Sequence, residues 1–294
     1  DGIGKKRDRF GDSKPGKRRA AGKFKDSEDG IGKKRDRFGD SKPGKRRAAR
    51  KLLDTNSRVD RTPRFQKQHK PMDPIKMEGL FDTLIPEVQH ALRKEGYTIP
   101  TPVQSQAIPP QIDSEDLFGS AQTGTGKTAA FTIPLLQELA ENRKRPASGH
   151  PRALILAPTR ELAAQIGKSI GIYGQFLPVS YTVIFGGVGQ RPQEEALDRG
   201  VDIVVATPGR LLDLIGQGYV DLNQVETFIL DEADRMLDMG FVPDVERIAS
   251  MLPPLRTTLL FSATMPKEIK KLAEKFLLNP KEVNVSPPST AADT

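Results

Sequence analysis

Two short segments contain the residue types that chemistry on a phosphate chain requires. The first is Ala121-Gln122-Thr123-Gly124-Thr125-Gly126-Lys127-Thr128. Its two glycines let the backbone turn N–H groups toward an anion. Lys127 can reach the outer phosphates, and the Thr128 hydroxyl can ligate Mg²⁺. On its own the run is also compatible with a plain glycine-rich turn, and Ala121 departs from the general G-x-x-x-x-G-K-[ST] pattern.

The second segment is Asp231-Glu232-Ala233-Asp234, which directly follows an apolar run ending at Leu230. A carboxylate at the carboxyl end of a buried parallel strand lies where ligands bind in open α/β sheets. We expect Asp231 to hold Mg²⁺, directly or through water, and Glu232 to orient or deprotonate an attacking water. An acidic helix start is the alternative interpretation. Together the segments predict a nucleoside-triphosphate site with Lys127, Asp231 and Glu232 as its catalytic residues.

An alternation of apolar strands and helices is expected to position both segments. Strands are expected at Leu117–Ala121, Ala153–Ala157, Tyr181–Phe185, Ile203–Ala206, Thr227–Leu230 and Leu259–Phe261, with one more at 283–285. Helices are expected near residues 129–142, 161–173, 193–198, 209–216, 243–252 and 267–278. This alternation predicts an α/β domain whose mostly parallel sheet is covered by helices on both faces.

Charge separates a basic leader from an acidic remainder. Residues 1–70 hold 25 Lys and Arg against 10 Asp and Glu, whereas residues 71–294 hold 21 against 28. Residues 1–21 recur unchanged as residues 29–49, with too few apolar side chains for a core. We expect residues 1–51 to be a disordered leader that attracts phosphate backbones without base specificity. An artefactual duplication is the alternative.

Several classes of protein are excluded or disfavoured by composition. The chain has no cysteine, so a disulfide framework and a thiolate metal site are excluded. Its three histidines are scattered, without ligand spacing. No run of about eighteen apolar residues occurs, so no membrane span is expected. The first residues are basic rather than apolar, which favours the cytoplasm, and we expect a monomer.

From residue 79 to about 286 the sequence resembles the N-terminal RecA-like domain of DEAD-box ATP-dependent RNA helicases. Stretches such as Leu230–Phe241 and Leu259–Thr264 are most similar to the bacterial RhlE-type branch. This family usually has alanine at the position of Ala121. The departure from the general phosphate-loop pattern therefore supports the resemblance. The resemblance implies a RecA-like P-loop domain at 80–286 and the start of a linker to a second RecA-like domain at 287–294. Residues 52–79 contain Pro63, Pro71 and Pro74 and no sustained periodicity, which predicts a linker before the domain.

The resemblance also implies ligands and an activity. These are ATP, Mg²⁺ and single-stranded or short duplex RNA, with RNA-stimulated ATP hydrolysis coupled to local unwinding of short duplexes. Without the second domain, such a fragment is expected to be poorly active alone. A lone ATP- or RNA-binding module without turnover is an alternative. A different P-loop enzyme, such as a kinase or a transporter ATPase, is disfavoured by Gln104, Asp231–Asp234 and Ser262–Thr264 together.

In this family an adenine-reading segment precedes the phosphate loop. Here it is Gly96-Tyr97-Thr98-Ile99-Pro100-Thr101-Pro102-Val103-Gln104, with Phe81 upstream. The Gln104 amide offers a donor and an acceptor that fit the adenine edge, and Tyr97 can stack on the base. Without the neighbouring match, Gln104 would be interpreted as an exposed helix residue.

The resemblance assigns RNA contacts to three groups, each of which follows a predicted strand. They are Pro158, Thr159, Arg160 and Glu161; Gly186 and Gly187; and Thr207, Pro208, Gly209 and Arg210. Plain capped turns are the alternative, and the two arginines either contact RNA or brace neighbouring loops.

A further segment is assigned to coupling hydrolysis to strand separation. Ser262 and Thr264 are expected to hydrogen-bond toward the segment that ends in Asp234. The alternative is that the two hydroxyls cap the helix that begins near Pro266.

Overall fold

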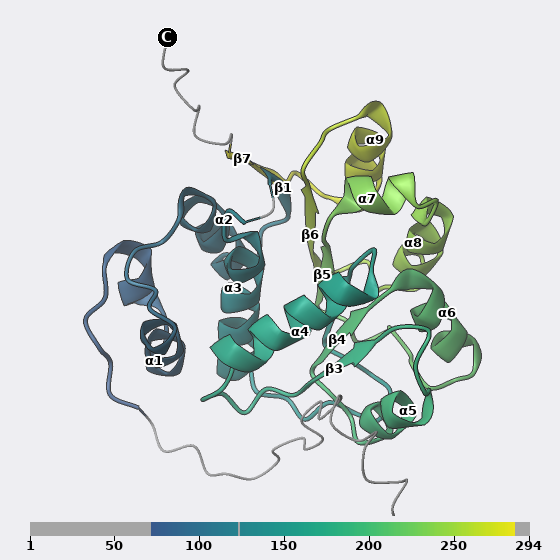
Figure 1. Ribbon diagram of the computed structural model, residues 1–294, viewed down its shortest axis with the longest axis horizontal. Coiled ribbons are helices and arrows are strands. Elements are labelled where there is room, and N and C mark those ends of the chain that lie inside the picture. Colours follow the sequence, from purple (N-terminus) through teal and green to yellow (C-terminus); the bar gives the residue numbers. More distant parts are fainter. Residues whose placement is uncertain (1–71, 123, 286–294) are drawn as a thin grey trace, which may run out of the picture. The chain divides into compact units, whose positions relative to one another are not determined.

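The sheet at the centre of the fold is parallel throughout and carries helices on both faces (Figure 1). A computed structural model describes residues 72–122 and 124–285. The expected leader at 1–51, most of the linker expected at 52–79, Thr123 and residues 287–294 lie outside the described residues.

Every strand expected from the sequence is present. The strands are β1 (Leu117–Ala121), β2 (Ala153–Leu156), β3 (Tyr181–Ile184), β4 (Ile203–Ala206), β5 (Thr227–Leu230), β6 (Thr257–Ser262) and β7 (Lys281–Val285). Their order across the sheet is β3-β4-β2-β5-β6-β1-β7, and each neighbouring pair is parallel. β2, β4 and β5 are apolar runs buried at every position, as expected for parallel strands that are covered on both faces.

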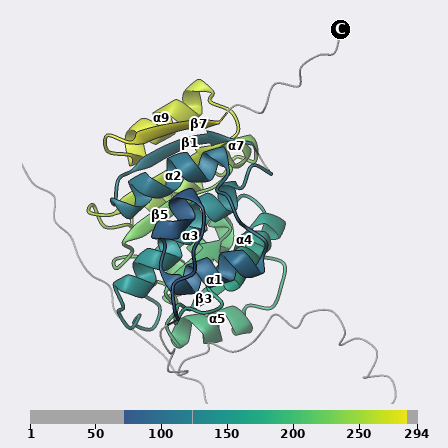
Figure 2. The ribbon, with the colours of Figure 1, turned by 90° about the vertical axis from the view of Figure 1, so that its left-hand side faces the viewer.

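The helices divide between the two faces of the sheet. They are α1 (Pro86–Lys94), α2 (Pro102–Ile112), α3 (Lys127–Glu141), α4 (Arg160–Tyr173), α5 (Arg191–Asp198), α6 (Pro208–Gly216), α7 (Ala233–Asp238), α8 (Val242–Ala249) and α9 (Lys267–Phe276), after a 3₁₀ turn at Gly79–Thr83. Figure 2 looks onto the face covered by α1, α2 and α3.

Two hydrophobic clusters hold these layers together. Successive strand side chains point to opposite faces. On β2, Ile155 joins the cluster that contains Phe131 of α3, whereas Leu154 and Leu156 join the cluster that contains Leu211 of α6. The domain therefore has the doubly covered α/β architecture that the sequence predicts.

Three helices were not expected from the sequence: α1, α2 and α7. The chain also contacts the core before residue 80, because Met77 is buried and Ile75 packs against the same cluster. No helix within the described residues is long and apolar enough to cross a membrane.

Candidate functional site

The two predicted chemical segments meet at the carboxyl edge of the sheet (Figure 1). β1 ends at Ala121 and leads into the glycine-rich loop, while β5 ends at Leu230 and leads into Asp231. β6 lies between them in the sheet and ends at Ser262. Because parallel strands end at one edge, all three candidate segments are brought together there.

The glycine-rich loop is shaped by its two glycines. Gly124 and Gly126 have φ angles of 85° and 92°, in the left-handed region that side chains disfavour. A Cβ on Gly126 would also lie 2.6 Å from Gln104 Nε2, so a side chain there would force a displacement. Inside the loop, the Thr125 hydroxyl donates to the Gln122 carbonyl at 2.8 Å. The loop therefore delivers the chain directly into α3, whose N-terminus favours an anion.

Lys127 and Asp231 join the loop to the acidic segment. Lys127 Nζ lies 2.8 Å from Asp231 Oδ1, and the two side chains are only 5% and 1% exposed. Burial raises the pKa of the Asp231 carboxyl, and the charge and hydrogen bond of Lys127 act against that rise. The predicted partnership of these two residues is thus realised as a buried ion pair.

The second oxygen of Asp231 indicates what else the site can hold. Asp231 Oδ2 is buried and has no hydrogen-bond partner among the residues that the structure describes, a situation that native structures usually resolve with water or an ion. Thr128, which follows Lys127 in the first turn of α3, supplies a half-buried hydroxyl. Oxygen donors of this kind fit Mg²⁺, which binds through one or two protein oxygens together with water and substrate phosphates. The described residues contain no cluster of three or more His, Cys, Asp or Glu suited to a metal cage.

Glu232 has an unusual backbone conformation. Its φ of 54° and ψ of 53° are left-handed, which costs a residue with a side chain about 1–2 kcal/mol. Its N–H donates to Asp231 Oδ1 at 3.0 Å, and its carboxylate accepts from Arg235 Nη1 at 3.3 Å. α7 begins at the next residue, Ala233, so the alternative of an acidic helix start also holds.

A cavity of about 320 Å³ lies in front of this segment. Its lining residues are Lys127, Glu232, Asp234, Arg235, Asp238 and Ala263. The candidate catalytic groups Lys127 and Glu232 therefore border one solvent-accessible space.

Asp234 connects the acidic segment to the end of β6. Its Oδ2 accepts from the Thr264 N–H at 2.9 Å and from the Thr264 hydroxyl at 3.0 Å, while the Ser262 hydroxyl donates to the Thr264 carbonyl at 2.7 Å. Partial burial alone would raise the pKa of Asp234, but the hydrogen bonds from Thr264 are the main influence that holds it below its ordinary value. α9 starts after Pro266 without a side-chain cap, so the alternative that these hydroxyls cap that helix is wrong.

Gln104 is fully buried, so its interpretation as an exposed helix residue is wrong. Its Oε1 accepts from the Thr101 N–H at 3.0 Å, and its Nε2 donates to the Gly126 carbonyl at 3.3 Å. Thr101 and Gln104 form a capping box at the start of α2. The amide expected to recognise the base is thus held directly against the phosphate loop.

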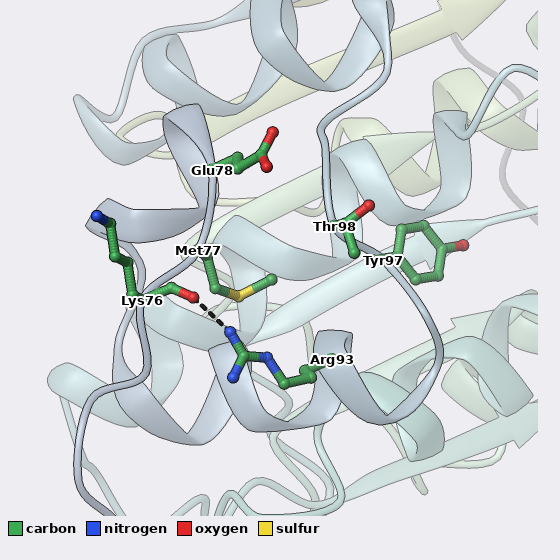
Figure 3. Close-up of a pocket in the computed structure, with 6 residues that line it drawn as sticks. All are labelled: Lys76, Met77, Glu78, Arg93, Tyr97 and Thr98. Atoms are coloured by element: carbon green, nitrogen blue, oxygen red, sulfur yellow. Dashed lines mark hydrogen bonds between the residues drawn. The ribbon is translucent and has the colours of Figure 1, made fainter.

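The two aromatic residues of the adenine-reading segment differ in their surroundings. Phe81 is fully buried in the core, so it has no exposed face for a nucleotide and instead supports this segment by packing. Tyr97 is half-buried and borders a second cavity, of about 270 Å³ (Figure 3). The other lining residues are Lys76, Met77, Glu78, Arg93 and Thr98. The Tyr97 hydroxyl points away from this cavity and lies 2.9 Å from the Tyr173 hydroxyl of α4.

The predicted RNA-facing groups follow β2, β3 and β4, which are neighbours in the sheet. Pro158 and Pro208 are buried, whereas Arg160, Glu161, Gly187 and Gly209 are exposed. The Thr159 hydroxyl caps α4 by accepting from the Leu162 N–H at 3.2 Å, whereas Thr207 makes no such cap for α6. The alternative of plain capped turns therefore explains only the first of these two threonines.

Both arginines make bracing contacts within the domain. Arg160 Nη1 donates to the Gly186 carbonyl at 3.5 Å, and a Cβ on Gly187 would approach the same nitrogen to 2.5 Å. Arg210 Nε lies 3.7 Å from Asp213 Oδ2, while its Nη1 is buried without a hydrogen-bond partner. Bracing is thus observed for both, and half of the Arg160 side chain remains exposed to a ligand.

Three residues near these groups were not singled out from the sequence. Arg235 pairs with Glu232, Tyr173 meets Tyr97, and the buried Gln193 donates from Nε2 to the Phe185 carbonyl at 3.1 Å, just before Gly186. Arg235 lies one helical turn from Glu232, a spacing that sequence reasoning could have used. The other two contacts depend on how distant elements pack.

Comparison with known proteins gives a consistent family. The family model described as DEAD/DEAH box helicase matches residues 101–272. "DEAD-box ATP-dependent RNA helicase 40" of Arabidopsis thaliana is 46% identical over 202 residues, which cover 69% of this chain and 18% of that protein. "DEAD-box ATP-dependent RNA helicase CshA" of Bacillus subtilis is 44% identical over 199 residues, which cover 68% and 39%. The chain spans less than half the length of these curated relatives.

Solved structures agree with this match. A DEAD box protein from Methanococcus jannaschii superposes with a TM-score of 0.63 at 40% identity, covering 69% of this chain and 55% of that one. A hypothetical ATP-dependent RNA helicase from Sulfolobus tokodaii gives a TM-score of 0.62 at 38% identity, covering 68% and 56%. The RecA-like fold expected from the sequence is thereby confirmed, whereas the assignment to the RhlE-type branch stays a prediction.

Proposed function

The chain belongs to the DEAD/DEAH box helicase family, and from this premise we propose that it is the ATP- and RNA-binding domain of an ATP-dependent RNA helicase. In this function RNA stimulates ATP hydrolysis, and hydrolysis is coupled to local unwinding of short duplexes. The observation that supports it most strongly is the ion pair between the phosphate loop and the acidic segment, in which Lys127 Nζ lies 2.8 Å from Asp231 Oδ1.

ATP binding uses groups that already face the edge of the sheet. The loop N–H groups, the N-terminus of α3 and Lys127 hold the phosphates. Asp231 and Thr128 would hold Mg²⁺, which when bound would supply positive charge to the phosphates. The Gln104 amide is buried against Gly126, so it contacts the adenine edge when the loop shifts around the bound nucleotide, and the Tyr97 ring offers a stacking face.

Hydrolysis requires a water placed in line with the terminal phosphate. Glu232 orients this water and accepts its proton as the water oxygen bonds to phosphorus and the bond to the bridging oxygen breaks. The Asp234–Thr264 contact links the acidic segment to the end of β6, so a displacement of the acidic segment should also displace the segment that follows β6.

RNA binding is proposed for the neighbouring loops after β2, β3 and β4. Backbone amides, hydroxyls and the N-termini of α4 and α6 can hold successive phosphates of one strand. Such contacts fix the strand without reading its bases.

Because the relatives are longer than this chain, we propose that further catalytic residues lie in a second RecA-like domain. Arginines from such a domain would stabilise the charge of the transition state, an effect worth about 10³–10⁵ in rate. We therefore propose that this chain alone binds ATP but turns it over very slowly.

A binding and turnover assay with Glu232→Gln tests the proposal. The chain should bind ATP with Mg²⁺ and prefer it to GTP, and Glu232→Gln should keep this binding because the amide has nearly the same shape. In an assembly with a second domain, RNA should stimulate turnover, and Glu232→Gln should abolish that turnover. Equal affinity for GTP and ATP, or turnover that survives Glu232→Gln, would contradict the assignments. Intact binding without RNA-stimulated turnover in the assembly would favour a pure binding module.

An RNA titration tests the proposed interface. Arg160→Ala should weaken the binding of single-stranded RNA. It should also lower the slope of log affinity against log salt concentration by about one unit, as expected for one phosphate contact. Arg191→Ala is the matched control, because Arg191 is an exposed arginine on α5 whose partner is Glu195. Equal effects of both substitutions would contradict a site at Arg160.

The basic leader receives its own test. Deleting residues 1–70 should reduce RNA affinity and its salt slope, if the leader is a sequence-independent tether. An unchanged slope would refute that idea.

A further inference from the structure

The C-terminal end of α4 touches the segment proposed to hold the base. Tyr97 Oη lies 2.9 Å from Tyr173 Oη, and the two rings meet edge to face at 87° with centroids 5.9 Å apart. Tyr173 is the last residue of α4 and is only 7% exposed. A half-buried ring is therefore anchored at its hydroxyl by a buried one.

Tyr173 keeps its phenol proton across the ordinary pH range. Burial raises the pKa of Tyr173, and the hydrogen bond with Tyr97 raises it further. The Tyr173 phenol therefore stays neutral and can donate or accept one hydrogen bond throughout.

The surrounding structure fixes Tyr173 in place. Where α4 passes over β3, Gly167 lies so close that a Cβ would approach Val183 Cγ2 to 2.4 Å. Beyond the end of α4, Lys94 Nζ donates to Gln175 Oε1 at 2.6 Å and lies 5.9 Å from the centre of the Phe176 ring. Lys94 thus holds the end of α1 to the segment that follows α4, and the close approach at Gly167 holds α4 against β3.

Tyr97 borders the cavity with a part of its side chain other than the hydroxyl. Figure 3 shows the hydroxyl directed away from the cavity that Tyr97 and Thr98 border. Tyr97 Oη lies on the axis about which the ring turns, so its contact with Tyr173 fixes the direction of the side chain, while the edge-to-face packing limits how the ring turns. The two contacts together favour one ring orientation before any ligand binds, which lowers the ordering cost of stacking.

We propose that Tyr173 is a positioning residue of the nucleotide site, which fixes the Tyr97 ring for stacking on the base without touching the nucleotide. This rests on the proposed function, because it needs a base on Tyr97. Through Tyr97, Tyr173 should affect the binding of the base. It should not affect the binding of the phosphates, which are held by a different part of the sheet edge.

Calorimetric titration of the full chain with ATP, ADP and inorganic tripolyphosphate, each with Mg²⁺, tests this assignment. Tyr173→Phe keeps the ring and removes only the hydroxyl. It should weaken ATP and ADP equally, by about 2- to 10-fold, as expected for one lost hydrogen bond. Tripolyphosphate has no base, so its affinity should stay within about twofold of wild type.

Two further variants keep the test sharp. Tyr97→Phe removes the other hydroxyl of the same contact, so it should also weaken ATP and ADP binding and leave tripolyphosphate binding unchanged. The double variant should bind ATP no more weakly than either single variant. Tyr219→Phe removes a hydroxyl from a tyrosine that packs against the other hydrophobic cluster, and should change no affinity.

The outcomes separate this inference from the proposed function. Unchanged ATP affinity in Tyr173→Phe, or equal weakening of tripolyphosphate, would overturn the role of Tyr173 and leave the proposed function intact. If the wild-type chain binds ATP no more tightly than tripolyphosphate, the proposed base site on Tyr97 is wrong. The positioning role of Tyr173 is then wrong as well.

Discussion

Removing the positive charge of Lys127 while Asp231 keeps its negative charge should destabilise the domain strongly. Lys127→Met retains most of the aliphatic stem and deletes the ammonium group 2.8 Å from Asp231 Oδ1. Asp231 Oδ2 has no hydrogen-bond partner within residues 72–122 and 124–285, so in the variant the Glu232 N–H is the hydrogen bond that this part of the chain leaves to the carboxylate. A buried charge that loses its partner typically costs about 3–5 kcal/mol of unfolding free energy.

Removing both charges should cost far less than removing one. The double variant Lys127→Met, Asp231→Asn leaves a neutral amide in place of the carboxylate. Buried ion pairs replaced by neutral groups are often nearly neutral in stability. We therefore expect the double variant to recover most of the loss, to within about 1–2 kcal/mol of wild type, which allows for unmade amide hydrogen bonds.

The single variant should also become sensitive to pH. Burial already raises the pKa of Asp231, and Lys127 is the main influence that lowers it. Without Lys127 the folded protein takes up a proton at a higher pH than the unfolded chain does. The unfolding free energy of Lys127→Met therefore falls as pH rises from the ordinary Asp value, 3.8, toward the raised folded value, and the deficit is largest above it.

Urea unfolding followed by circular dichroism, at several pH values for wild type and the three variants, measures these differences. Asp231→Asn alone completes the double-mutant cycle. The reasoning is refuted if Lys127→Met is as stable as wild type near neutral pH, or if the double variant is no more stable than Lys127→Met. A deficit that stays the same at every pH from 3.8 upward would refute the electrostatic cause and leave the loss of stability itself standing.

Three further predictions concern the loop, the coupling contact and the strained glutamate. Gly126→Ala should lower stability by about 1–3 kcal/mol, because its φ is 92° and its Cβ would lie 2.6 Å from a side-chain nitrogen; Gly216→Ala, in open space on α6, should be neutral or stabilising in the same thermal melts. Thr264→Val should cost about 1 kcal/mol near neutral pH, since Asp234 is only partly buried and water screens the contact. Because the pKa of Asp234 is lowered in the folded state, that difference should vanish as pH falls through the folded value, below 3.8, and a difference that persists there would count against it. Glu232→Gly should be more stable than Glu232→Ala by about 1 kcal/mol, because glycine adopts a φ of 54° without strain, and equal urea midpoints would contradict this.

Much of the sheet could be predicted from the sequence because its strands are short apolar runs. β2, β4 and β5 are buried at every position, so their signal does not depend on finding an alternation. α2 was missed although Thr101 and Gln104 have the spacing of a capping box, since Pro109 and Pro110 near its end obscure the helical pattern.

For the site, residue types were predictable and their contacts were less so. The glycine-rich run and the acidic run name Lys127 and Asp231 because the chemistry demands those groups. The burial of Gln104 and the meeting of Tyr97 with Tyr173, 76 residues apart, depend on how α1, α2 and α4 pack. No periodicity in a single sequence encodes such distant side-chain pairs.

Conformational and electrostatic costs lie at the carboxyl ends of β5 and β1, on either side of β6. After β5, Asp231 is buried with one oxygen unpaired among the described residues, and Glu232 is held in a left-handed conformation. After β1, Gly126 adopts a φ that other residues avoid. The strands themselves are buried apolar runs, and they hold these features in place. The costs bring Lys127, Asp231 and Glu232 to one edge of the sheet, which is the arrangement that a preorganised phosphate site requires and a domain selected only for stability would lack.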